Sequence, residues 1–161
     1  MLKLIACDLD DTLLRNDFSV SEKNRKAIDA VKKRGIKIII LTGRATAAVK
    51  PIVGELELDE PFASFQGAKI IDPKTDEVLY SCQLEKDDIL DILKYAENND
   101  IHVNIYDDKR IYVRNINKWS DFYKGFARKV DIIEVGTLQD YDFKETPKIV
   151  FIDENVQDED P

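Results

Sequence analysis

The first fourteen residues constrain the fold more than any other stretch of this chain. An apolar run, Leu4–Cys7, stops abruptly at Asp8, and a second carboxylate, Asp10, follows two residues later. Such a run is typical of a strand that is buried on both faces of a sheet. In open α/β folds, ligands bind beyond the carboxyl ends of the strands. The pattern therefore predicts that Asp8 and Asp10 lie at a ligand-binding edge of a sheet.

The spacing of the two acids favours a shared cation. Asp8 and Asp10 alternate with Leu9, so an extended backbone would direct both carboxylates to the same side. Two neighbouring carboxylates repel each other unless a cation or a shared proton lies between them, and magnesium prefers oxygen ligands of this kind. We therefore predict a magnesium site in which one acid is free to attack phosphorus. The alternative is a polar turn that ends a strand.

The next elements lead back to the same edge. A helix is expected to begin near residue 20, with Ser19 and Glu22 at capping-box spacing and Ser21 as a rival cap. An apolar second strand follows over residues 36–41. A strand, a helix and a strand in succession form a right-handed βαβ unit with parallel strands. The second strand should therefore end beside Asp8.

That second strand is followed by Thr42, Gly43 and Arg44. A hydroxyl beside a glycine lets a side-chain donor and a bare backbone amide converge on an anion. The helix expected over residues 45–56 points its amino end at the same place, which favours an oxyanion site. The alternative is a strand-to-helix turn that Thr42 caps. Pro51 is expected to bend or interrupt that helix.

Together the two motifs resemble those of the haloacid dehalogenase-like hydrolases, which carry Asp-x-Asp-x-Thr after a buried strand. Thr-Gly-Arg resembles the second motif of the Cof-type sugar-phosphatase branch. The resemblance implies a magnesium-dependent phosphatase that acts on a small phosphorylated metabolite, a sugar phosphate or a nucleotide, through an aspartyl-phosphate. Arg44 is typical of the branch, where it either touches substrate or bridges loops. Gln66 stands where the branch usually has Asn, so no catalytic part is assigned to it.

The resemblance also implies a role for each site residue. Asp8 is the nucleophile, and Asp10 is the acid that protonates the leaving oxygen and then activates water. Leu9, through its amide, and Thr42 and Gly43 hold the phosphoryl oxygens. Magnesium is held by the Asp8 carboxylate and the Asp10 backbone carbonyl.

The second half of the chain has a different pattern of apolar and polar residues. A hairpin is expected over residues 69–80, then a helix over 85–99, a strand over 101–105 with one solvated face, and a strand over 147–153. Four aromatic residues at helical spacing are predicted to be core: Trp119, Phe122, Tyr123 and Phe126. This run resembles the α+β cap that Cof-type enzymes insert after the second motif, where it selects the leaving group.

The predicted fold is α/β, with an incomplete Rossmann-like parallel-sheet core over residues 1–80 and an α+β cap over 81–161. The family also needs a Lys and an acidic Gly-Asp-x-x-Asn-Asp motif after the cap, and the motif does not occur in this sequence. The strand that carries Asp8 should then keep an unpaired edge, which favours self-association or a partner segment. The pairs 107–108 and 153–154 are possible substitutes for the missing acids, but each fits a surface turn.

Two other functions are therefore weighed against a phosphatase. The first is a catalytically incomplete remnant that binds phosphate or a partner protein. The second is a receiver-type phosphoacceptor, against which Thr-Gly-Arg and the cap-like half both argue.

Composition excludes several other classes. The net charge of −8 argues against nucleic-acid binding, and no apolar run approaches the roughly 18 residues of a membrane span. Asp8 comes too early for a secretory signal. Cys7 and Cys82 give no disulfide framework, so a reducing cytoplasm is expected. With His102 as its only histidine, the chain cannot form a multi-histidine metal site.

Overall fold

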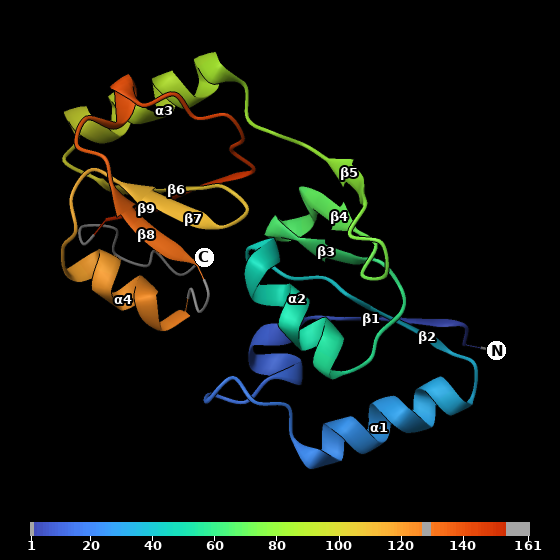
Figure 1. Cartoon of the computed structure of the whole chain (residues 1–161). Helices are drawn as coiled ribbons and strands as arrows, with labels where there is room; N and C mark the ends of the chain where they lie inside the picture. Colours follow the sequence, from blue (N-terminus) through green and yellow to red (C-terminus); the bar gives the residue numbers. More distant parts are fainter. Residues whose placement is uncertain (1, 127–129, 154–161) are drawn as a thin grey trace, which may run out of the picture. The chain divides into compact units, whose positions relative to one another are not determined.

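The computed structural model describes residues 2–126 and 130–153, in two compact units that comprise residues 1–82 and 83–161 (Figure 1). The architecture is α/β, as predicted: a Rossmann-like parallel strand pair begins the first unit, and the second unit combines α-helices with a mainly antiparallel sheet. Within the described ranges, no helix is both long enough and apolar enough to cross a membrane.

The first unit is built on two parallel strands. Strand β1 pairs with β2 in parallel register, with Cys7 opposite Ile40, and a single parallel bridge joins Leu41 to Ala63 at the start of the next sheet. That sheet is antiparallel, in the order β3-β4-β5. The elements are β1 (Leu4–Cys7), α1 (Glu22–Lys33), β2 (Lys37–Ile40), α2 (Thr46–Glu55), β3 (Phe62–Ser64), β4 (Lys69–Ile71) and β5 (Val78–Ser81).

Helices α1 and α2 share one apolar core with the strands. Ser21 caps α1, because its hydroxyl oxygen accepts a hydrogen bond of 3.0 Å from the Asn24 amide, and Gly35 follows the helix with φ of +69°. Ser21, and not Ser19, is therefore the cap. The fully or nearly buried members of the core include Leu9, Ile28, Ile38, Ile40, Val49, Val53 and Phe62.

One expectation for this unit is wrong, and of the bend or interruption expected at Pro51 the interruption does not occur. Strand β1 is not buried on both faces: Leu4 is 44% exposed, because among the described residues β1 pairs with β2 alone and its other edge is open. Helix α2 is not interrupted at Pro51. Pro51 faces solvent while Val49 and Val53 hold the helix on the core, so the lost amide bond is tolerated.

The second unit is a four-stranded sheet with a helix on each face. Strand order is β8-β7-β6-β9, with β6 antiparallel to both neighbours and β7 parallel to β8. Helix α3 lies above this sheet and α4 below it in Figure 1. The elements are α3 (Lys86–Asn98), β6 (His102–Tyr106), β7 (Arg110–Val113), α4 (Lys118–Phe126), β8 (Asp131–Glu134) and β9 (Lys148–Ile152).

Strand β6 does not have the solvated face that its alternating sequence predicted. Asn104 is fully buried, because β6 is a central strand of a sheet that is covered on both faces. Its two faces still differ in character. Val103 and Ile105 pack in the apolar core with α3, so His102 and Asn104 point toward the opposite face.

The aromatic stripe of α4 is not the core that its spacing predicted. Phe122 is 58% exposed, and Trp119 and Tyr123 are half-buried. Among the side chains of this helix that the structure describes, those of residues 118–124, the fully buried one is Ser120. This part of α4 therefore turns its small residue inward and leaves its rings at the flanks. The predicted burial of Phe126 lies outside the described side chains.

Candidate active site

The carboxyl ends of β1 and β2 lie side by side and bring the two motifs to one edge. The Leu41 amide donates a hydrogen bond of 3.0 Å to the Cys7 carbonyl. Asp8 directly follows β1, and Thr42 comes two residues after β2. The parallel pairing that the sequence predicted thus places Asp8 and Thr42 at the same end of one strand pair.

The loop that carries the two acids is fixed by Leu9. Residues Leu9–Leu13 form a wide helical turn, in which the Leu14 amide donates to the Leu9 carbonyl at 2.8 Å. Asp11 takes the left-handed conformation, with φ of +54°. Leu9 is fully buried whereas Asp8 and Asp10 are exposed. The Leu9 side chain anchors the turn, and both carboxylates face outward from it.

Thr42 is buried and held by three backbone contacts. Its amide donates to the Ala63 carbonyl at 3.1 Å, its carbonyl accepts from the Gln66 amide at 3.0 Å, and its hydroxyl oxygen accepts from the Arg44 amide at 3.3 Å. Helix α2 is capped at Ala45, without a side-chain bond. The alternative in which Thr42 caps this helix is therefore wrong.

Gly43 lies close to Gln66, a residue to which no catalytic part was assigned from the sequence. A Cβ atom on Gly43 would lie 2.9 Å from the Gln66 Nε2 atom and 3.2 Å from its Cδ atom. The bare backbone at Gly43 therefore lets the Gln66 side chain approach the corner that Thr42 forms.

Arg44 bridges the two loops. Its Nε atom donates to Asp10 Oδ2 at 2.8 Å and its Nη2 atom to Oδ1 at 2.5 Å. The guanidinium carbon lies 4.9 Å from the centre of the Phe18 ring, an arrangement that attracts a cation. The Arg44 side chain is 10% exposed and that of Asp10 is 47% exposed. The two roles predicted for Arg44 were contact with the substrate and bridging of loops, and in this structure Arg44 bridges the loops.

Phe18 was not singled out by the sequence, because it belongs to no periodic apolar pattern. It takes φ of +64° in the loop before α1, where its ring covers Arg44. A single aromatic residue in an irregular loop gives no signal that sequence reasoning can detect.

Cys7 packs as a half-buried thiol beside the acids. Burial, and then the negative charge of Asp8, raise the pKa of the Cys7 thiol above its ordinary value, and its Sγ atom lies 3.3 Å from the Asp8 carbonyl. The protonated thiol therefore persists at neutral pH, which agrees with a packing role and not a nucleophilic one.

The donors available for magnesium are oxygen atoms of the Asp8–Asp10 turn. The Asp8 carboxylate, one of the two predicted donors, is exposed. The Asp10 carboxylate is engaged by Arg44, and the second predicted donor is the Asp10 backbone carbonyl. Residues 2–126 and 130–153 hold no group of three or more His, Cys, Asp or Glu side chains that could bind a metal. One carboxylate and one carbonyl suit magnesium, because this ion keeps several water ligands.

The other two acid pairs belong to the second unit. The Asp107 carboxylate accepts hydrogen bonds of 2.7 Å from the amides of Lys109 and Arg110 and from the Tyr112 hydroxyl. It therefore belongs to the turn between β6 and β7. Asp153 follows β9 in the second unit, and its predicted companion Glu154 lies outside the described residues.

Comparison with known proteins identifies the family. A family model described as haloacid dehalogenase-like hydrolase matches residues 5–160. The chain belongs to this family. Among curated relatives, the putative phosphatase YxeH of Bacillus subtilis is 30% identical over 165 residues, which cover 95% of this chain and 58% of YxeH.

A shorter match and a solved structure complete the comparison. The 5-amino-6-(5-phospho-D-ribitylamino)uracil phosphatase YcsE of Bacillus subtilis is 35% identical over 71 residues, 44% of this chain and 28% of YcsE. A crystal structure of a haloacid dehalogenase-like hydrolase from Bacteroides thetaiotaomicron superposes with a TM-score of 0.80 at 25% identity, over 95% of this chain and 59% of that one. This member of the haloacid dehalogenase-like hydrolases therefore spans less than two thirds of the proteins that it matches.

Proposed function

We propose that this chain carries the nucleophile-bearing part of a magnesium-dependent phosphatase that forms an aspartyl-phosphate on Asp8. The observation that carries the proposal is the placement of Asp8 and the Thr42 corner at the same end of one strand pair. The family and the phosphatase names of its relatives support the reaction type.

The proposed reaction has two steps. In the first, an Asp8 carboxylate oxygen attacks the phosphorus, the ester bond breaks, and Asp10 gives a proton to the leaving oxygen. In the second, Asp10 takes a proton from a water molecule, which attacks the phosphorus and releases phosphate from Asp8. Magnesium bound to the Asp8 carboxylate and the Asp10 carbonyl would offset the charge of the phosphoryl group.

The other residues of the site would bind and orient the phosphoryl group. The Thr42 hydroxyl and the amides of Leu9 and Gly43 are the proposed donors to its equatorial oxygens. Arg44 would fix the position of Asp10.

The proposed substrate is a small phosphorylated metabolite, a sugar phosphate or a nucleotide. YcsE, whose name describes a phosphatase for a phosphorylated ribitylamino-uracil, supports this class. The second unit, as the proposed cap, would select the leaving group. The proposed location, the cytoplasm, rests on the sequence alone.

A magnesium-dependent assay with p-nitrophenyl phosphate tests the proposal. Asp8→Asn should abolish turnover and leave the thermal transition in place, because Asp8 is exposed. Asp11→Asn is the matched control: it removes a neighbouring acid, and Asn tolerates the left-handed conformation at this position. Retained turnover in Asp8→Asn, or its loss in Asp11→Asn, would remove Asp8 from the proposed role.

The second candidate is a catalytically incomplete chain that binds phosphate or a partner protein. It is favoured by the absence of Gly-Asp-x-x-Asn-Asp from the 161 residues. Calorimetric titration with magnesium and inorganic phosphate, combined with the p-nitrophenyl phosphate assay, separates the two candidates, because the second predicts saturable binding without turnover.

A further inference from the structure

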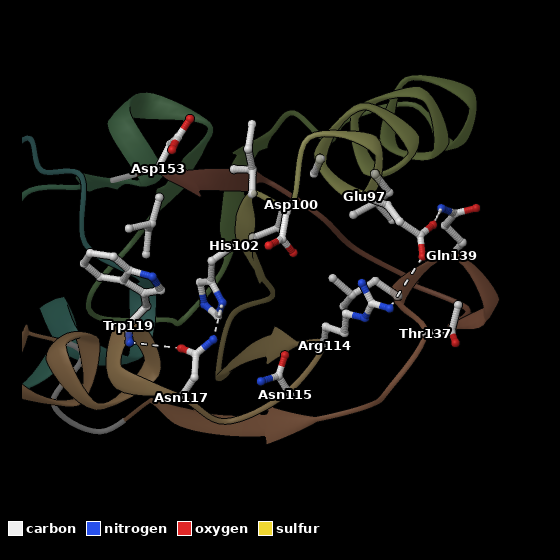
Figure 2. A pocket seen from close by; sticks show the side chains of 16 residues that line it. Glu97, Asp100, His102, Arg114, Asn115, Asn117, Trp119, Thr137, Gln139 and Asp153 are labelled. Carbon is white, nitrogen blue, oxygen red and sulfur yellow. Dashed lines mark hydrogen bonds and ion pairs between the residues drawn. The ribbon is translucent and has the colours of Figure 1, made fainter. Parts of the chain in front are cut away.

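A polar pocket of about 620 Å³ opens at one end of the sheet in the second unit (Figure 2). Its wall includes the start of β6, the segment after β7, the first turn of α4 and the residue that follows β9. His102, Asn117 and Trp119 lie together on one side of this pocket. His102 is the only histidine and Trp119 the only tryptophan of the chain.

Both ring nitrogens of His102 are engaged by asparagine side chains. The Nε2 atom lies 3.0 Å from Asn104 Oδ1, and the Nδ1 atom lies 3.1 Å from Asn117 Nδ2. Asn104 is fully buried. The imidazole therefore links a central strand of the sheet to the residue that precedes α4.

Asn117 is the N-cap of α4. Its Oδ1 atom accepts hydrogen bonds from the amides of Trp119 at 3.0 Å and Ser120 at 3.3 Å. Both donors belong to the backbone, so they fix which end of the side-chain amide is oxygen. Asn117 must therefore present its NH₂ group to His102.

The orientation of Asn117 dictates the protonation state of His102. Because Asn117 Nδ2 is a donor, the facing Nδ1 atom must be an acceptor without a proton. The ring proton is then on Nε2, where it is donated to Asn104 Oδ1. This arrangement is satisfied only by a neutral imidazole. A second proton would set the Nδ1–H against the NH₂ of Asn117, two donors facing each other.

We propose that the hydrogen-bond chain from Asn104 through His102 to Asn117 is a pH-sensitive device, which holds the first turn of α4 while His102 is neutral and loosens it when His102 is protonated. To meet an imidazolium, Asn117 must either turn its oxygen toward the ring, and so leave the Trp119 and Ser120 amides, or move away. Either movement shifts Trp119, which forms part of the pocket wall.

The surroundings of His102 support the neutral form. Burial lowers the pKa of the imidazole below its ordinary value, and the hydrogen bond that the ring donates to Asn104 opposes this effect less strongly. The charged side chains nearest to the pocket come from each neighbouring segment and comprise Glu97 on α3, Asp100 before β6, Arg114 after β7, Lys118 on α4 and Asp153 after β9. Two of them are already paired, because Arg114 lies 3.7 Å from the Glu97 carboxylate.

The lowered pKa sets the direction of the pH dependence. A proton binds the unfolded chain more readily than the folded one, so the stabilisation by neutral His102 is complete above the unfolded value of about 6.5. It is lost as the pH falls from that value through the folded pKa. Carboxyl, lysine and arginine side chains ordinarily change charge outside the interval from about pH 5 to 7.5. A change that occurs within this interval is therefore assigned to His102.

Nuclear magnetic resonance of the 161-residue chain between about pH 7.5 and 5 tests the proposal. The ring nitrogens should report the Nε2–H tautomer at neutral pH, and the His102 midpoint should lie below about 6.5. The protection factors of the Trp119 and Ser120 amides, which compare the observed exchange rate with the intrinsic rate at each pH, should fall about fivefold with the same midpoint, the factor that corresponds to one lost helix cap. An Nδ1–H tautomer, a midpoint at or above 6.5, or amides that do not follow His102 would overturn the proposal.

Two variants should change the pH response in different ways. Asn117→Asp keeps the cap, since Asp is a good N-cap, but offers a carboxylate oxygen to a protonated Nδ1. Its His102 midpoint should rise above about 6.5, and the Trp119 amide should stay protected on acidification. His102→Gln removes the titrating group, so Trp119 fluorescence should no longer change across this interval. An unchanged midpoint in Asn117→Asp, or a retained fluorescence transition in His102→Gln, would contradict the proposed device.

Discussion

At the scale of single residues, the two loops of the site are joined by Arg44, whose bridging role was predicted but whose partner, Asp10, was not. Arg44 directly follows the Thr42 corner, but its guanidinium reaches a carboxylate 34 residues earlier in the chain. Phe18 covers the same guanidinium from a third segment. The motifs predicted which residues gather at the edge, and the parallel pairing of β1 with β2 explains why. The motifs could not predict which side chains pair with each other, because pairing depends on the exact conformation of the loops that carry them.

The Arg44–Asp10 pair should be energetically coupled. We expect a double-mutant cycle with Arg44→Ala and Asp10→Ala to give about 1 kcal/mol of coupling in the free energy of unfolding, the upper range for a partly exposed pair. Two aligned hydrogen bonds and the buried guanidinium account for this value.

The matched control is the Lys50–Asp76 pair, at 2.6 Å, in which both side chains are more exposed. Its coupling should be smaller, a few tenths of a kcal/mol. Urea denaturation measures both cycles, and equal coupling in the two pairs would argue against a special constraint on Asp10.

At the scale of elements, strand β1 has an edge that stays unpaired among the described residues. The carbonyls of Lys3 and Cys7 accept from the amides of Lys37 and Leu41 across the pair with β2. Because polar groups alternate in direction along a strand, the amide of Ala6 points away from β2. An exposed edge of this kind is a template for another strand.

We expect the chain to self-associate through this edge in light-scattering measurements. Ala6→Pro should shift it toward the monomer, because proline removes the outward amide and keeps the bonds to β2. Ile5→Pro is the comparison, since it removes an amide that faces β2 and should lower stability instead. A monodisperse wild-type monomer, or association that survives Ala6→Pro, would show that β1 is not the contact.

The ends of a helix that carries capping residues were predicted well from the sequence. The burial of strands and helices, which depends on the elements packed against them, was not. Ser21 and Gly35 bound α1 as their capping chemistry indicates. The alternation of β6 was misread because burial on its second face comes from β7, β9 and α4, which its own residues do not specify. The exposed Phe122 shows the same limit, since helical spacing predicts a stripe but not what covers it.

At the scale of the whole molecule, the sequence predicted the fold class and the family through two short motifs. Both motifs follow strands whose parallel pairing the structure confirms. The hydrogen-bond chain through His102 could not be found in this way, because Asn104 and Asn117 meet the ring only in the folded sheet. We propose that one phosphoryl group binds where β1 and β2 end.

Amide chemical shifts measured during titration with inorganic phosphate in the presence of magnesium test this claim most directly. The account predicts saturable shifts at Leu9 and Gly43 that disappear without magnesium and weaken in Thr42→Val, which removes the hydroxyl without changing the shape of the side chain. Phosphate that leaves both amides unmoved at saturating concentration, or that shifts only residues of the second unit, would contradict it.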